Sequence, residues 1–84
     1  MSTPMQIRLR ILRVLEVYSP NSAPTEALRD AVNTDLPRKL TTEQLALELV
    51  WLLGQAMVDK IADPLDPDAA RWVITRVGLG ALRQ

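Results

Sequence analysis

The sequence has 84 residues, with ten basic and ten acidic side chains, no cysteine, no histidine and a hydrophobic fraction of 48%. This length suits one small domain, and we expect a single domain over residues 1–84. The missing cysteines exclude disulfide bonds and thiolate metal sites, and the missing histidines remove the most common zinc ligand and general base. A net charge of zero also lacks the basic excess that is typical of a strong nucleic-acid binder.

A first helix is predicted over residues 4–18, because Pro4 suits the first helical turn, where a missing backbone N–H costs nothing. Alternating polarity over residues 7–11 also fits a strand, but the later i, i+3, i+4 spacing favours a helix. The stripe expected to face the core contains Ile7, Ile11, Val14, Leu15 and Tyr18. A second apolar arc contains Met5, Leu9 and Leu12. These residues either support dimerisation through this helix or pack under the wing or the C-terminal turn.

Two further helices follow along the chain. The second is predicted over residues 24–33 and ends before Pro37, which disfavours helical geometry at the residue preceding it. The third is predicted over residues 42–55, because Thr41 and Gln44 match a capping box. In that motif each of the two side chains accepts a hydrogen bond from the backbone N–H of the other residue.

The C-terminal part of the sequence predicts a β-hairpin. Residues 57–61 and 70–75 are short apolar runs rich in β-branched side chains, and they flank an aspartate- and proline-rich turn at residues 63–68. Thr75 can cap a short final helical turn over residues 76–83, which two glycines weaken.

Three helices followed by a hairpin is the element order of a winged-helix domain, and two stretches of the sequence resemble that family. Residues 53–58 (LGQAMV) resemble the exit of a third helix into the first wing strand. Residues 70–78 (ARWVITRVG), followed by Ala81 and Leu82, are similar to the end of many bacterial winged-helix regulators. The expected fold is therefore mainly α with a small β-hairpin, a three-helix winged-helix domain with a two-stranded wing. The chain also loosely resembles the small winged-helix proteins of Mu-like phages and prophages.

The resemblance implies DNA binding, with the third helix in the major groove and the wing on phosphate or in the minor groove. The charge of these two elements argues against that docking. The third helix contains Glu43 and Glu48 and no lysine or arginine, which gives it a net charge of −2. The wing, residues 57–75, also has a net charge of −2, from Asp59, Asp63, Asp66 and Asp68 against Lys60 and Arg71. Non-specific DNA affinity depends on neutralising phosphates, so the usual docking is not expected.

The third helix instead presents an apolar pair on the side predicted to meet solvent. At roughly 100° per residue, its core-facing arc contains Leu45, Ala46, Leu49, Val50, Leu52, Leu53 and Ala56. Trp51 falls on the opposite side, among Gln44, Glu48 and Gln55, and Leu47 lies one turn earlier. Either other parts of the chain cover Trp51, or the pair binds a protein partner or a second copy. We predict a protein interface at Leu47 and Trp51, with Leu9 and Leu12 of the first helix as further candidates.

A DNA-binding regulator is the alternative function. It would contact phosphates through Arg10 and Arg13 of the first helix and through Arg38 and Lys39, which precede the third helix. Arg10 and Arg13 share a helix face, so they can act together. An ordinary solvated helix surface explains the same arginines, and for that reason protein contact is the main hypothesis.

No catalytic, metal-binding or cofactor-binding set is predicted. Asp63, Asp66 and Asp68 suggest calcium, but their spacing does not fit an EF-hand loop, and the prolines between them favour a stiff turn. The serines have no histidine to activate them, and the three glycines are dispersed. No apolar run approaches the roughly 20 residues that a membrane span needs. We therefore expect a non-catalytic, cytoplasmic interaction module that uses no cofactor.

Overall fold

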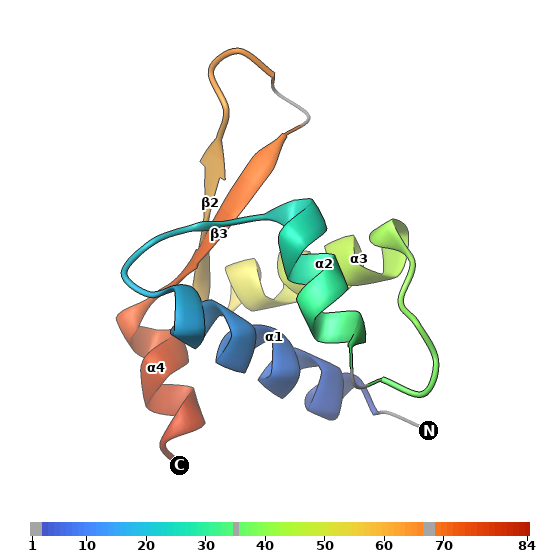
Figure 1. Cartoon of the computed structure of the whole chain (residues 1–84). Helices are drawn as coiled ribbons and strands as arrows, with labels where there is room; N and C mark the ends of the chain where they lie inside the picture. Colours follow the sequence, from blue (N-terminus) through green and yellow to red (C-terminus); the bar gives the residue numbers. More distant parts are fainter. Residues whose placement is uncertain (1–2, 35, 67–68) are drawn as a thin grey trace.

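The computed structural model describes residues 3–34, 36–66 and 69–84. Its elements are, in chain order, α1 (Pro4–Tyr18), β1 (Ala23–Pro24), α2 (Thr25–Asn33), α3 (Thr42–Gly54), β2 (Val58–Ala62), β3 (Ala70–Ile74) and α4 (Arg76–Leu82). The expected class, three helices followed by a β wing, is confirmed. Figure 1 shows the helices gathered into one body, from which the β2–β3 hairpin projects.

Side-chain caps fix where α1 and α3 begin. The backbone N–H of Gln44 donates to Thr41 Oγ1 at 3.1 Å, and the N–H of Thr41 donates to Gln44 Oε1 at 2.9 Å, which confirms the predicted capping box. Thr3 and Gln6 form the same box at the start of α1, at 3.2 and 2.9 Å. The sequence has the same spacing there, but the prediction used only Pro4.

A short strand joins the hairpin to the helical body. The sheet has the order β1-β3-β2, and both pairs are antiparallel. β1 pairs Ala23 with Trp72, while β2 pairs Val58 with Ile74 and Lys60 with Trp72. The strand β1 was not predicted, because a two-residue strand has no periodicity of its own and exists only through its pairing with β3.

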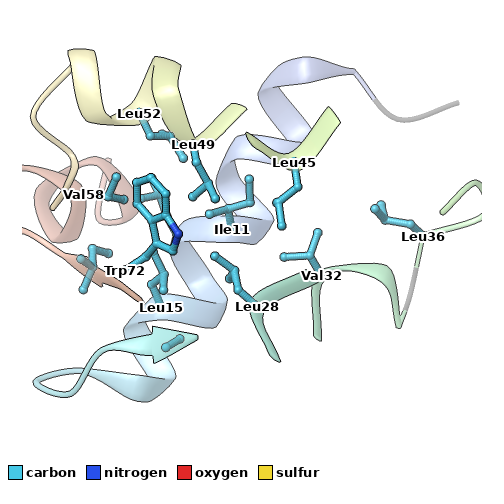
Figure 2. Packing of buried hydrophobic residues seen from close by; sticks show 13 residues of the cluster. Ile11, Leu15, Leu28, Val32, Leu36, Leu45, Leu49, Leu52, Val58 and Trp72 are labelled. Atoms are coloured by element: carbon cyan, nitrogen blue, oxygen red, sulfur yellow. The ribbon is translucent and has the colours of Figure 1, made fainter. Parts of the chain in front are cut away.

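The core lies between the three main helices and the base of the sheet (Figure 2). Its fully or nearly fully buried residues are Ile11, Leu12, Leu15, Ala23, Leu28, Val32, Leu36, Leu45, Leu49, Leu52, Val58, Trp72 and Ile74. Trp72 is the only aromatic side chain in this set, and its Nε1 donates to Thr25 Oγ1 at 2.9 Å. That bond satisfies the indole N–H, which would otherwise be costly to bury.

Two predictions about burial were wrong. Only Leu45, Leu49 and Leu52 of the predicted α3 arc are buried, whereas Val50 is 63% exposed, Leu53 is 38% exposed and the alanines of that arc are also exposed. The buried stripe of α3 is therefore narrower than predicted, because few elements pack against this helix at the edge of a small domain.

The second wrong prediction concerns Leu12, the interface candidate on α1. Its side chain is only 2% exposed, so it belongs to the core and is not available on the surface. It lies beside Met57 and Ala81, and α4 packs against α1. The second interpretation of the apolar arc on the first helix, packing under the wing or the C-terminal turn, is therefore correct for Leu12, which lies beside α4.

α4 is fixed by close backbone contacts with the α3–β2 connection. Thr75 Oγ1 accepts from the N–H of Gly78 at 3.2 Å, as predicted for a cap, and donates to the carbonyl of Ala56 at 2.6 Å. A Cβ atom on Gly78 would lie 2.3 Å from the carbonyl oxygen of Met57, so this position requires glycine. Within the described ranges, none of the helices is long and apolar enough to cross a bilayer.

Candidate functional site

The predicted interface residue Trp51 is held in place by an arginine from α1. The guanidinium carbon of Arg8 lies 3.7 Å from the centre of the Trp51 ring, and Arg8 Nε donates to Glu48 Oε2 at 2.9 Å. The Arg8 and Glu48 side chains are 26% and 18% exposed, so water screens the pair only in part. Trp51 itself remains 39% exposed, which means that one ring face is covered by Arg8 while other parts of the indole stay accessible.

Two separate apolar hollows lie beside α1 and α3, and we call the two together the α1–α3 groove. The first has a volume of about 150 Å³ and is lined by Met5, Arg8, Leu9, Leu12, Trp51, Leu52, Met57 and Ala81. The second has a volume of about 190 Å³ and is lined by Pro4, Ile7, Leu40, Gln44, Leu47 and Glu48. Because Arg8 belongs to the first hollow and Glu48 to the second, their ion pair separates the two.

The structure brings together candidates that the sequence placed on separate helices. Leu9 and Trp51 line the same hollow, with Leu12 as a core residue at its base. Leu47 lines the neighbouring hollow and is 71% exposed, while Leu9 is 37% exposed. Met5, which is 66% exposed, completes the rim. The predicted interface residues other than Leu12 are therefore accessible, with Leu9 and Trp51 at one hollow and Leu47 at the other.

The basic candidates are divided between structural and exposed positions. Arg10 Nε donates to the carbonyl of Val32 at 3.1 Å, and Lys39 Nζ donates to the carbonyls of Asn33 and, at 3.3 Å, Leu36. The two cations therefore meet at the C-terminal end of α2. There they bind its last carbonyls and offset the negative end of the helix dipole. Sequence reasoning did not show that these two side chains cap a helix.

Arg13 and Arg38 have exposed side chains. Arg38 belongs to the segment that leads into the N-cap of α3, and Arg29 reaches the same end of α3, where its Nη1 donates to Thr42 Oγ1 at 2.6 Å. The start of α3 thus has two basic side chains near it, those of Arg29 and Arg38, although Glu43 and Asp30 also lie there.

The wing supplies little positive charge for an anion. Arg71 donates to Ser22 Oγ at 2.8 Å and to the carbonyl of Ser22 at 3.0 Å, so it ties β3 to the α1–β1 connection. Lys60 Nζ lies 5.9 Å from the centre of the Trp72 ring. Asp63 Oδ1 accepts from the N–H of Leu65 at 2.8 Å, an arrangement typical of a turn. Asp68 lies outside the described residues, and the described residues contain no group of three or more acidic side chains that could hold a metal ion.

Comparison with solved structures identifies the fold as a winged helix. The chain is similar to the PcaV transcriptional regulator from Streptomyces coelicolor, at 22% identity and a TM-score of 0.73, covering 99% of this chain and 51% of that protein. It is also similar to the transcriptional regulator BldR from Sulfolobus solfataricus, at 18% identity and a TM-score of 0.65, covering 88% of this chain and 49% of that one. A PadR family transcription regulator from Clostridium difficile is 12% identical, with a TM-score of 0.68, and 89% and 79% of the two chains are covered.

The chain spans about half the length of PcaV and BldR, and at these identities the likeness concerns the fold. No family model and no curated relative matches the sequence. The three similar proteins are described as regulators of transcription. None of the three is described as a phage protein, and the loose resemblance to Mu-like phage proteins stays a prediction.

Sequence reasoning missed Arg8 and Met57 as parts of the site. Arg8 projects from α1 on the border of the buried stripe, next to Ile11 and Leu15, and an arginine at such a border requires a partner. Glu48 was assigned to the solvent side of α3, so nothing in the sequence joined the two. Met57 follows the predicted end of the helix, and only the tertiary fold places it beside α1.

Proposed function

We propose that this chain is the DNA-binding winged-helix module of a transcription regulator, and that it holds duplex DNA mainly through phosphate contacts. The proposal is supported by the match of 99% of the chain to the fold of the PcaV transcriptional regulator and by the element order, in which two consecutive helices, α2 and α3, precede the hairpin. In that fold the second helix of the pair approaches the major groove and the wing approaches the flanking backbone.

The start of α3 is the best-supported phosphate contact. Arg38 is exposed three residues before the N-cap Thr41, and Arg29 reaches the same end of the helix. Lys39 has a third ammonium N–H besides the two that it donates to the carbonyls of Asn33 and Leu36. The positive end of the α3 dipole adds to these charges. Arg13 is exposed on α1 as a further candidate, whereas Arg10 is engaged with the end of α2.

Direct reading of base sequence by α3 has less support. The exposed side of this helix offers Ala46, Leu47 and Val50, with no arginine or lysine that could bond to guanine. Phosphate contacts position a protein on DNA but carry no sequence information. We therefore expect salt-sensitive binding with little discrimination between sequences.

The test is a fluorescence anisotropy titration of a labelled duplex of mixed sequence at several salt concentrations. Arg38→Glu should weaken binding severalfold and lower the slope of log affinity against log salt by about 0.9 for each phosphate that the variant no longer neutralises. Arg83→Glu is the matched control, because this exposed arginine follows α4, away from the start of α3 (Figure 1). An equal effect of the two substitutions, or no salt-sensitive binding at micromolar protein, would contradict the proposal.

Contact with protein is the second candidate function, and the exposed apolar side of α3 favours it. Leu47 and Trp51 remain accessible in the folded chain, and the helix that carries them has a net charge of −2. Exposed tryptophan and leucine side chains on an acidic helix suit a protein partner better than a polyanion. Leu47→Ala should then weaken association with that partner without unfolding the domain, and unchanged association would contradict this function.

A further inference from the structure

We infer that a second copy of this chain docks on the exposed side of α3, with the two α3 helices antiparallel and Leu47 of each copy packed against the partner's Trp51. This inference extends the protein-contact function to a specific partner and does not rest on DNA binding. It is carried by the α1–α3 groove and by the distribution of charge along α3.

The surface has the shape that a self-complementary contact needs. Leu47 is the most exposed large hydrophobic side chain of the groove, at 71%, and it stands one helical turn from the hollow beside Trp51. In a two-fold interface, residue i of one copy meets residue j of the other, and j meets i. An axis that crosses α3 between residues 47 and 51 therefore places each leucine against the other copy's tryptophan. The hollow of about 150 Å³ has room for one such side chain, because cavities of this size hold a group as large as benzene.

The charges of the surface favour a copy of itself over a charged partner. Glu48 is already paired with Arg8 of its own chain at 2.9 Å, so the middle of the surface has no unpaired charge. In the antiparallel arrangement, Glu43 in the first turn lies opposite the partner's Gln55, which is uncharged. A parallel arrangement would place Glu43 beside the partner's Glu43 and would be repulsive.

The uncovered area suits a weak dimer. Met5, Leu9, Leu47 and Trp51 are 66%, 37%, 71% and 39% exposed. Together they leave on the order of 400 Å² of apolar surface, about half of the roughly 800 Å² that each partner buries in a standard interface. The segment before α3, with Arg38, lies outside this contact and stays accessible to phosphate, whereas the dimer covers the side of α3 that approaches DNA in a winged helix.

Sedimentation of the full chain from about 5 to 500 µM tests the inference, since a weak dimer shows concentration-dependent mass. Leu47→Glu should raise the dimer dissociation constant at least tenfold, because the new carboxylate would be buried without a partner. Val17→Glu is the matched control, because Val17 is 84% exposed on α1 and outside the groove. A monomer throughout this range, or equal effects of the two substitutions, would overturn the inference. Circular dichroism confirms that both variants are folded.

A gain-of-affinity substitution tests the orientation. In the antiparallel dimer, Gln55→Lys would form two symmetry-related ion pairs, each with the partner's Glu43. The dimer dissociation constant should fall about threefold to fivefold. Adding Glu43→Gln should remove that gain, and a gain that survives would overturn the antiparallel arrangement.

Fluorescence anisotropy of labelled duplex DNA with the same variants distinguishes the dimer from the proposed DNA-binding function. If the monomeric Leu47→Glu variant still binds DNA, the phosphate contacts lie outside the dimer contact. If the wild-type chain forms a dimer that depends on Leu47 but does not bind DNA, only the proposed DNA-binding function is contradicted.

Discussion

The contact between α4 and the α3–β2 connection predicts opposite outcomes for two glycines of the same short helix. At Gly78, a Cβ atom would lie 2.3 Å from the carbonyl oxygen of Met57 and 2.7 Å from Ile74 Cγ1. At Gly80, an added Cβ would meet nothing within 4 Å. The clash at Gly78 cannot be relieved by a side-chain rotation alone, because the Met57 carbonyl is backbone and accepts from the N–H of Thr75 at 3.0 Å.

The expected magnitudes follow from this geometry. Gly78→Ala gains about 1 kcal/mol of helix propensity but costs about 2–3 kcal/mol, the upper part of the usual overpacking range, because the clash is with backbone, so we expect a net loss of about 1–2 kcal/mol. Gly80→Ala gains about 0.5–1 kcal/mol, because only the propensity changes. A domain of this size shifts its Tm by about 4–8 °C per kcal/mol, so the two melting temperatures should differ by at least about 6 °C.

Thermal unfolding followed by far-UV circular dichroism measures both variants beside the wild type, and urea denaturation gives the free energies of unfolding. The two substitutions have the same chemistry on one helix, so each is the control for the other. A Gly78→Ala variant as stable as the wild type would refute the close approach of α4 to Met57. Equal destabilisation by Gly80→Ala would point to a general intolerance of α4 and would refute it as well.

Three further predictions concern stability, and urea unfolding measures each. Ala56 follows the C-cap residue of α3 and has a φ of 60°, so Ala56→Gly should raise the free energy of unfolding by about 0.5–1 kcal/mol, and a decrease would contradict a left-handed residue there. Thr25→Val should cost about 1–2 kcal/mol, because the Trp72 N–H is left without its acceptor, and a neutral result would contradict that bond. Arg8→Met keeps most of the apolar stem and should cost about 1 kcal/mol, because it removes the interactions with Glu48 and the indole; unchanged stability would show that these interactions contribute nothing.

Local sequence signals, such as caps and turn residues, were sufficient to predict the main helices. The pairing between strands that lie far apart in the chain could not be predicted from the sequence. The start of α3 was predictable because Thr41 and Gln44 lie three residues apart and define the cap by themselves. The strand β1 was not predictable, because Ala23 becomes a strand residue only when β3 lies beside it. The end of α3 was predicted to within one residue, at Gln55 against Gly54. The left-handed conformation of Ala56 was not predicted, because the residue at this position is not a glycine.

The parts of the candidate site that depend on one helix alone were predictable from the sequence, because a helical projection shows which side chains lie opposite the buried stripe. Leu47 and Trp51 are exposed, in keeping with their place opposite the buried stripe. The prediction for Leu12 was wrong because α4 covers a side of α1 that the helix alone cannot reveal. The roles of Arg10 and Lys39 at the end of α2 were hidden for the same reason, since each bonds to carbonyls of another element.

Backbone NMR of the wild-type chain during titration with duplex DNA tests the central claim, that this winged helix binds phosphates at the start of α3. At low salt, the amides of residues 36–44 should shift, those around Arg83 should stay unchanged, and added salt should reverse the shifts. Shifts confined to other parts of the chain, or no shifts at any salt concentration, would contradict the claim.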